Sequence, residues 1–124
     1  MIEQESKFNA DARSSTGAIG LMQLQPATAE GIALRTGGSK FVLSDLYNPE
    51  INVRYGAWYL RHLLDKYGNE RTALAAYNAG QENVDRWRRD HEPVQFPETR
   101  AYVDRVERLK AIYRRAYKSA LGLP

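Results

Sequence analysis

Apolar residues recur at helical spacing between Asn48 and Gly68, falling three or four positions apart. At the start of this stretch, Asn48-Pro49-Glu50 offers an N-cap side chain, a proline for the first helical position and an early acid. At its end, Gly68 can adopt the left-handed conformation at which many helices stop. The pattern therefore predicts a helix from Pro49 to Tyr67.

Similar signals predict four more helices. They are a helix that starts near Pro26, covers Thr28–Arg35 and ends at Gly37-Gly38, one over Glu70–Ala79 that ends at Gly80, a short one that holds Val84 and Trp87, and a long C-terminal one. The apolar positions of the last helix are Tyr102, Val103, Val106, Leu109, Ile112, Tyr113, Ala116 and Ala120. We interpret this stripe as core packing.

Two segments interrupt the helical pattern. The prolines in His91–Pro97 predict an extended surface loop, and the glycine- and serine-rich run Ser14–Gly20 predicts a structured loop. No stretch alternates between apolar and polar residues beside hairpin turns, so strands should be few or absent. The predicted fold class is mainly α.

Composition limits the class of protein. With 124 residues and 43% hydrophobic residues, the chain has enough apolar surface for one core, so residues 1–124 should form a single domain. The net charge of +3 would suit an anionic partner, but the basic residues lie on polar helix faces, where a solvated surface is the ordinary explanation. No apolar run has the roughly 18 residues of a membrane span. Nor do the first residues resemble a signal peptide, so we expect any export signal to have been removed or to lie upstream.

Few residues can carry catalysis. The chain has no cysteine, its two histidines are far apart, and it has no phosphate-binding glycine motif, so carboxylates remain as candidates. Glu5 is followed by Ser6 and Phe8, and an apolar neighbour would raise the pKa of its carboxyl toward the range of a general acid. From these residues alone, Glu5 is either such an acid or an ordinary exposed carboxylate.

Several short motifs occur in a characteristic order. They are Glu5-Ser6-x-Phe8, Ser14-x-x-Gly17-Ala18-x-Gly20-Leu21-Met22-Gln23-Leu24-x-Pro26-x-Thr28-Ala29, Asn48-Pro49, Gly56-Ala57-Trp58-Tyr59-Leu60, Ala75-Ala76-Tyr77-Asn78-Ala79-Gly80 and Phe96-Pro97-Glu98-Thr99-Arg100-x-Tyr102-Val103. This order resembles the catalytic domain of the soluble lytic transglycosylase (SLT) family over nearly the whole chain. The resemblance implies a single lysozyme-like helical domain of the goose-type class, with a substrate cleft.

The resemblance also implies a reaction. Glu5 would be the one catalytic acid and base, protonating the bond between N-acetylmuramic acid and N-acetylglucosamine in peptidoglycan. It would then take the proton of the muramic C6 hydroxyl, whose oxygen attacks C1 to give a 1,6-anhydro product without water. No cofactor or metal is implied.

Other residues match the family's substrate-binding positions. Those expected to contact the glycan are Ser14, Gln23, Gln25, Tyr77, Asn78, Glu98 and Tyr102. The Tyr77 hydroxyl would orient an N-acetyl group. Asn78 is equally well explained as a helix-capping residue, and Tyr102 as part of the core.

The chain departs from the family pattern at three places. Only four residues precede Glu5, so the first helix should be short or truncated. Gln25 stands where many members carry methionine, which should alter the contact with the sugar. Ala10 stands where a proline often follows Asn9, which should loosen the loop.

Three other functions stay open. A hydrolytic muramidase of the same fold would need a second carboxylate, for which Asp11, Glu30 and Asp45 are candidates. A non-catalytic glycan-binding module would keep the fold without the reaction. A nucleic-acid-binding domain has only the net charge in its favour. We expect a monomer that acts on peptidoglycan strands in the periplasm or the cell wall, and no nucleic-acid partner.

Overall fold

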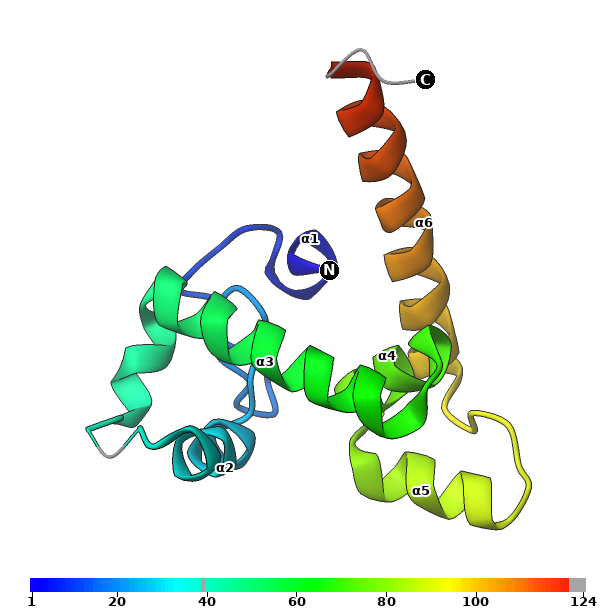
Figure 1. Ribbon diagram of the computed structural model, residues 1–124, viewed down its shortest axis with the longest axis horizontal. Coiled ribbons are helices and arrows are strands. Elements are labelled where there is room, and N and C mark those ends of the chain that lie inside the picture. The colour runs from blue at the N-terminus through cyan, green and yellow to red at the C-terminus, as the bar shows by residue number, and fades with distance from the viewer. Residues whose placement is uncertain (39, 121–124) are drawn as a thin grey trace. The chain divides into compact units, whose positions relative to one another are not determined.

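The computed structural model describes residues 1–38 and 40–120, and its regular elements are helices joined by loops (Figure 1). Its helices are α1 (Ile2–Ser6), α2 (Pro26–Thr36), the 3₁₀ helix η1 (Leu43–Tyr47), α3 (Pro49–Tyr67), α4 (Glu70–Ala79), α5 (Gln81–Arg89) and α6 (Pro97–Ala120). Within these ranges there is no strand, and extended pairing is limited to the isolated bridges Arg13–Ile19 and Ile19–Leu24. The predicted mainly α fold class is confirmed.

The chain divides into two compact units, which are described separately. The N-terminal unit comprises residues 2–65, and the C-terminal unit comprises Met1 and the residues from Lys66 onward. The expectation that residues 1–124 form one domain stays a prediction.

Helix α3 has the predicted bounds for the predicted reason. The Asn48 side chain accepts hydrogen bonds from the amides of Glu50 (3.0 Å) and Ile51 (3.3 Å), which caps the first turn. Gly68 has a φ of 65°, the left-handed conformation that ends a helix. Both signals act within a few residues, so they could be recognised without knowledge of the rest of the chain.

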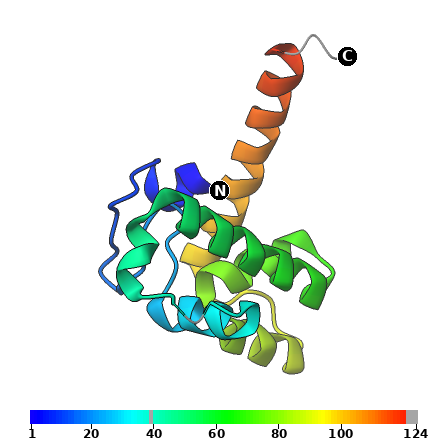
Figure 2. The ribbon, with the colours of Figure 1, turned by 60° about the vertical axis from the view of Figure 1, so that its left-hand side comes forward.

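In the N-terminal unit, α2 and η1 precede α3 (Figure 2). The α2 helix starts at Pro26, as predicted, because proline fits the first helical turn. It ends as predicted at Gly37, whose φ is 76°. The η1 helix was not predicted. In it the Asp45 carboxylate accepts a hydrogen bond from the Val42 amide at 3.1 Å, while Leu46 is fully buried.

In the C-terminal unit, α4 packs against both α5 and α6. Asn69 caps α4 by accepting a hydrogen bond from the Thr72 amide at 2.9 Å. The small buried side chains of Ala73 and Ala76 let the neighbouring helices approach closely, and Val106 of α6 is also buried. Exposed ion pairs, Arg71 with Asp104 and Glu107 and Lys110 with Glu70, link α4 to α6.

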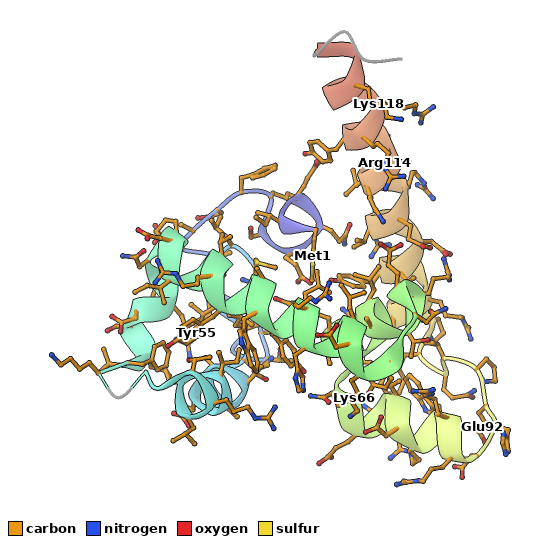
Figure 3. All side chains as sticks on the ribbon, viewed as in Figure 1. Met1, Tyr55, Lys66, Glu92, Arg114 and Lys118 are labelled. Carbon is orange, nitrogen blue, oxygen red and sulfur yellow. The ribbon has the colours of Figure 1, made fainter. Side chains whose placement is uncertain are left out.

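The end of α3 is tied to α5 by polar contacts. The Tyr67 hydroxyl donates to Asp85 at 2.7 Å, and Lys66, labelled in Figure 3, lies 2.9 Å from the same carboxylate. The Tyr67 hydrogen bond, helped by Lys66, lowers the pKa of Asp85 from its ordinary value.

The segment before α6 is partly as predicted. Residues 91–96 contain no helix, but α6 already begins at Pro97, five residues before the first apolar position used to predict it. The prediction assigned Pro97 to the loop and was wrong there, because a proline that follows a break is favoured as the first residue of the next helix. Phe96 packs edge-on against Trp87 with ring centroids 4.9 Å apart.

Gly56→Ala should destabilise the protein by about 1–3 kcal/mol, because overpacking a filled core forces its neighbours to move. A Cβ at this position would lie 2.8 Å from the Cβ and 2.9 Å from the Cε of Met22.

Gly31→Ala, in α2, is the matched control. A Cβ there meets nothing within 4 Å, so this change should stabilise the protein by up to about 1 kcal/mol through helix propensity. Urea unfolding of both variants checks the pair, and equal stability would contradict the packing argument.

Candidate functional site

The loop that joins α1 to α2 is held together by its own backbone. The Gly20 amide donates to the Ala12 carbonyl at 2.8 Å, and Ile19 and Leu24 exchange two hydrogen bonds of 3.0 Å. These bonds give the irregular segment a defined shape, so it presents its side chains from fixed positions.

One buried amide fastens this loop to α3. The Asn52 side chain accepts a hydrogen bond from the Met22 amide (2.7 Å) and donates to the carbonyls of Ile19 and Leu46 (both 2.9 Å). Asn52 is fully buried, where an unmade hydrogen bond is costly. Sequence analysis missed this residue. Its signal was an amide at a helix-interior position four residues before Gly56, where a simple apolar stripe would have a hydrophobic residue.

Gly20 is explained by the same contact. It has a φ of 81°, and a Cβ there would overlap the Asn52 amide nitrogen and lie 2.6 Å from the Leu46 carbonyl oxygen. The glycine is therefore needed both for its conformation and for the space it leaves.

Glu5 lies next to the end of the five-residue helix α1 and is half-buried. After this helix the chain turns through Lys7 and Phe8, both in the left-handed region with φ of 52° and 62°. The sequence argument used Phe8 as the apolar neighbour that would desolvate Glu5. The Phe8 side chain is 61% exposed, so it does not supply a buried apolar wall.

Ser14 and Gln25 are linked through Thr16, a residue that sequence analysis did not single out. The Ser14 hydroxyl accepts from the Ala18 amide at 3.0 Å and shares a hydrogen bond of 3.0 Å with the Thr16 hydroxyl. The Gln25 amide donates to the same Thr16 oxygen at 3.2 Å. The three polar side chains are thus brought together along one edge of the loop.

Gln23 serves the loop itself. Its side-chain amide donates to the carbonyls of Ala12 (3.1 Å) and Gly20 (2.9 Å), and its backbone has a left-handed φ of 49°. The amide nitrogen is therefore already used, and the side-chain oxygen is the group that stays available to a ligand.

In the C-terminal unit, Asn78 connects the end of α4 to the start of α6. Its side-chain oxygen accepts a hydrogen bond of 2.8 Å from Thr99, which is 2% exposed. The side chain thus bonds to another helix, in addition to any capping role. Thr99 was also missed, because its partner lies 21 residues away along the chain.

The other predicted residues of this unit differ in exposure. Glu98 is exposed in the first turn of α6 and Tyr77 is half-buried near the end of α4. Tyr102 is only 3% exposed, which favours the core alternative for its ring. Its contact with substrate stays a prediction. Glu5, Ser14, Gln23 and Gln25 lie in the N-terminal unit, and that they share one substrate with Tyr77, Asn78, Glu98 and Tyr102 also stays a prediction.

A pocket of about 230 Å³ in the C-terminal unit includes none of the predicted residues. Its lining residues are Arg71, Thr72, Ala75, Val84, Trp87, Arg88, Glu92, Pro93, Val94, Arg100 and Val103. Residues 1–38 and 40–120 contain no group of three or more His, Cys, Asp or Glu side chains placed to hold a metal ion.

The family model of the transglycosylase SLT domain matches residues 1–96. The chain belongs to this family. The SLT domain is 36% identical over 128 residues to a soluble lytic murein transglycosylase of Salmonella typhimurium, covering 90% of the chain and 19% of that protein. It is 40% identical over 80 residues to a transglycosylase of Enterobacteria phage PRD1, covering 64% of the chain and 27% of that protein. It thus spans about a fifth to a quarter of the length of these relatives.

Solved structures agree with the fold. A lytic transglycosylase Slt of Pseudomonas aeruginosa, solved as an inactive mutant, superposes with a TM-score of 0.79 at 36% identity, over 99% of this chain and 21% of that one. The complex of a 70-kDa soluble lytic transglycosylase with bulgecin A gives a TM-score of 0.86 at 34% identity, over 94% and 21% of the two chains. The predicted resemblance to SLT catalytic domains is confirmed.

Asn52→Asp should destabilise this SLT domain by about 2–4 kcal/mol. The change keeps the shape but replaces two buried donors by an oxygen that faces the Ile19 and Leu46 carbonyls. Asn9→Asp is the matched control, because exposed Asn9 only accepts a hydrogen bond from the Asp11 amide, which aspartate also does. It should stay within about 0.5 kcal/mol of the parent. Urea unfolding measures both, and a stable Asn52→Asp protein would show that the loop does not depend on this amide.

Proposed function

We propose that this SLT domain cleaves the β-1,4 bond between N-acetylmuramic acid and N-acetylglucosamine in peptidoglycan, without water. The observation that carries the proposal is the family match over residues 1–96, which includes Glu5 and the loop anchored by Asn52. The relatives are named murein transglycosylases, which supports the same substrate class for this chain.

In the first step, Glu5 acts as the acid. Its protonated carboxyl gives the proton to the glycosidic oxygen, and the bond from that oxygen to C1 of the muramic sugar breaks. The oxygen of the sugar's own N-acetyl group stabilises the positive charge that develops at C1. One protein carboxyl is then sufficient, in contrast to the two of most glycosidases.

In the second step, Glu5 acts as the base. The carboxylate takes the proton of the C6 hydroxyl of the same sugar, and the freed oxygen attacks C1 to form the 1,6-anhydro ring. Glu5 ends protonated, as it began, and no water is consumed. Because the attacking hydroxyl belongs to the sugar that carries C1, the step gains the advantage of an intramolecular reaction.

The other predicted residues would bind the glycan. Ser14 and Gln25 offer a hydroxyl and an amide at the loop edge, while Gln23 offers the oxygen of its side chain. Tyr77 would orient an N-acetyl group. Asn78, whose side-chain oxygen accepts from Thr99, would offer its amide nitrogen from α4, and Glu98 and Tyr102 would contribute from α6.

The three candidate second carboxylates of the hydrolytic alternative differ in their contacts. Asp45 is used to cap the Val42 amide in η1. Glu30 is exposed on α2, and Asp11 is exposed in the loop with its own backbone amide bonded to Asn9. The names of the relatives, lytic murein transglycosylase and transglycosylase, support non-hydrolytic cleavage over the hydrolytic alternative.

The place of action follows from the substrate. Peptidoglycan lies outside the cytoplasmic membrane, so the domain would act in the periplasm or the cell wall, bound to glycan strands as a monomer. No helix in the described ranges is long and apolar enough to cross a membrane. The relatives include both soluble and membrane-bound lytic murein transglycosylases.

Purified peptidoglycan digested in H₂¹⁸O should release fragments that end in 1,6-anhydromuramic acid and carry no ¹⁸O, as read by mass spectrometry. Glu5→Gln should lower the rate by about 10²- to 10⁴-fold, the usual contribution of a general acid and base.

Glu3→Gln is the control, because it makes the same change two residues earlier on α1 and should leave the rate within about twofold. Reducing ends labelled with ¹⁸O would identify a hydrolase instead. Binding to peptidoglycan with no products from the parent protein would identify a non-catalytic module.

A further inference from the structure

The polar edge of the loop contains one more residue than the family resemblance assigns to substrate binding. Thr16 lies between Ser14 and Gln25, 3.0 Å from the Ser14 hydroxyl and 3.2 Å from the Gln25 amide nitrogen. All three belong to the N-terminal unit, so their arrangement depends only on the loop and the start of α2.

The hydroxyl hydrogens of Ser14 and Thr16 can be assigned to their hydrogen bonds. Ser14 accepts from the Ala18 amide and Thr16 accepts from Gln25, so the two hydroxyls have one bond to share between them. One hydroxyl donates in that bond, and the hydrogen of the other stays available. The side-chain oxygen of Gln25 has no hydrogen-bond donor within the described ranges. Whichever hydroxyl donates, the edge therefore offers one O–H donor and one amide acceptor.

We propose that Ser14, Thr16 and Gln25 form a subsite for a sugar hydroxyl group. A hydroxyl both accepts and donates through a single oxygen, so it can take the free O–H hydrogen while it donates to the Gln25 oxygen. A trans peptide group has its N–H and C=O pointing in opposite directions and does not match two adjacent groups in this way. A carboxylate only accepts, and it would leave the Gln25 oxygen unpaired. The assignment of the hydroxyl to peptidoglycan glycan rests on the proposed function.

The surroundings leave room for such a ligand. Thr16 and Gln25 are exposed, and a Cβ built on neighbouring Gly17 would meet nothing within 4 Å. Hydrogen bonds at an exposed edge exchange readily with water and add little to stability. A change at Thr16 should therefore leave the fold intact and report on binding.

The test is an NMR titration of the whole chain with peptide-free chitotriose, followed through the side-chain amide signals of Gln25. Thr16→Val and Gln25→Met should each raise the Kd by about two- to tenfold, the effect of one hydrogen bond between uncharged groups. The double variant should bind no more weakly than the worse single variant, because both changes break the same unit. Thr16→Ser should restore the parent Kd and the parent Gln25 signals.

Thr36→Val is the matched control, since exposed Thr36 only bonds to the carbonyl of Ile32 in its own helix. The same titration with the N-acetylglucosaminyl-N-acetylmuramic acid disaccharide, with and without its peptide stem, separates sugar from peptide recognition. This disaccharide lacks the bond that the proposed reaction breaks.

Equal effects of Thr16→Val on both forms of the disaccharide support a hydroxyl subsite. Four results would each overturn it. They are an effect of Thr16→Val only on the peptide-bearing form, a Kd unchanged by Thr16→Val, a Kd increase in the double variant equal to the product of the two single increases, and no binding of chitotriose. Cleavage by Glu5 is measured separately. The proposal of the subsite can therefore be wrong while the proposal of transglycosylase activity is right, or the activity can be absent while the subsite binds sugar.

Discussion

The N-terminal unit depends on the three hydrogen bonds of one buried amide. Asn52 satisfies an amide of the loop, a carbonyl of the loop and a carbonyl of η1, while its own backbone remains part of α3. Without it, the Met22 amide, the Ile19 carbonyl and the Leu46 carbonyl would each lose one hydrogen bond in the interior, although the Ile19 carbonyl would keep the bond from the Leu24 amide. A buried backbone group left unsatisfied costs about 1–3 kcal/mol. An apolar side chain of the same size would fill the space but pair with none of them. The contact also explains why Gly20 must be small and why the chain of polar side chains has a fixed base.

The parts of the fold that sequence predicts well are those with local signals. The cap at Asn48, the stop at Gly68 and the proline-interrupted segment before α6 each act within a few residues, and the structure places helix boundaries there or close by. Asn52 acts over 30 and 33 residues, so a helical pattern could show only that a polar residue stood at a core position. The η1 helix was missed for a related reason, because it is stabilised by the burial of Leu46 and by the Asp45 cap rather than by an extended periodic pattern.

The contacts of the candidate site could not be predicted from its motifs. The order of motifs selected Glu5, Ser14 and Gln23 as site residues, and their roles stay predictions. It could not show that the Gln23 amide is committed to the loop or that Ser14 reaches Thr16. A motif therefore combines residues that stabilise the backbone with residues that are free to bind a ligand. The hydrogen-bond partners seen in the structure distinguish the two kinds of residue.

The loop also has two regions with different tolerance to change. Its base, from Ile19 to Met22, is fixed to α3, whereas Ser15 at its tip is exposed and Gly17 faces open space. Substitutions and short insertions at the tip would leave the anchored base in place. Related domains can therefore diverge in length and polarity at this tip while they keep the same scaffold, and a spectroscopic label attached at Ser15 would lie next to the proposed subsite without disturbing the core.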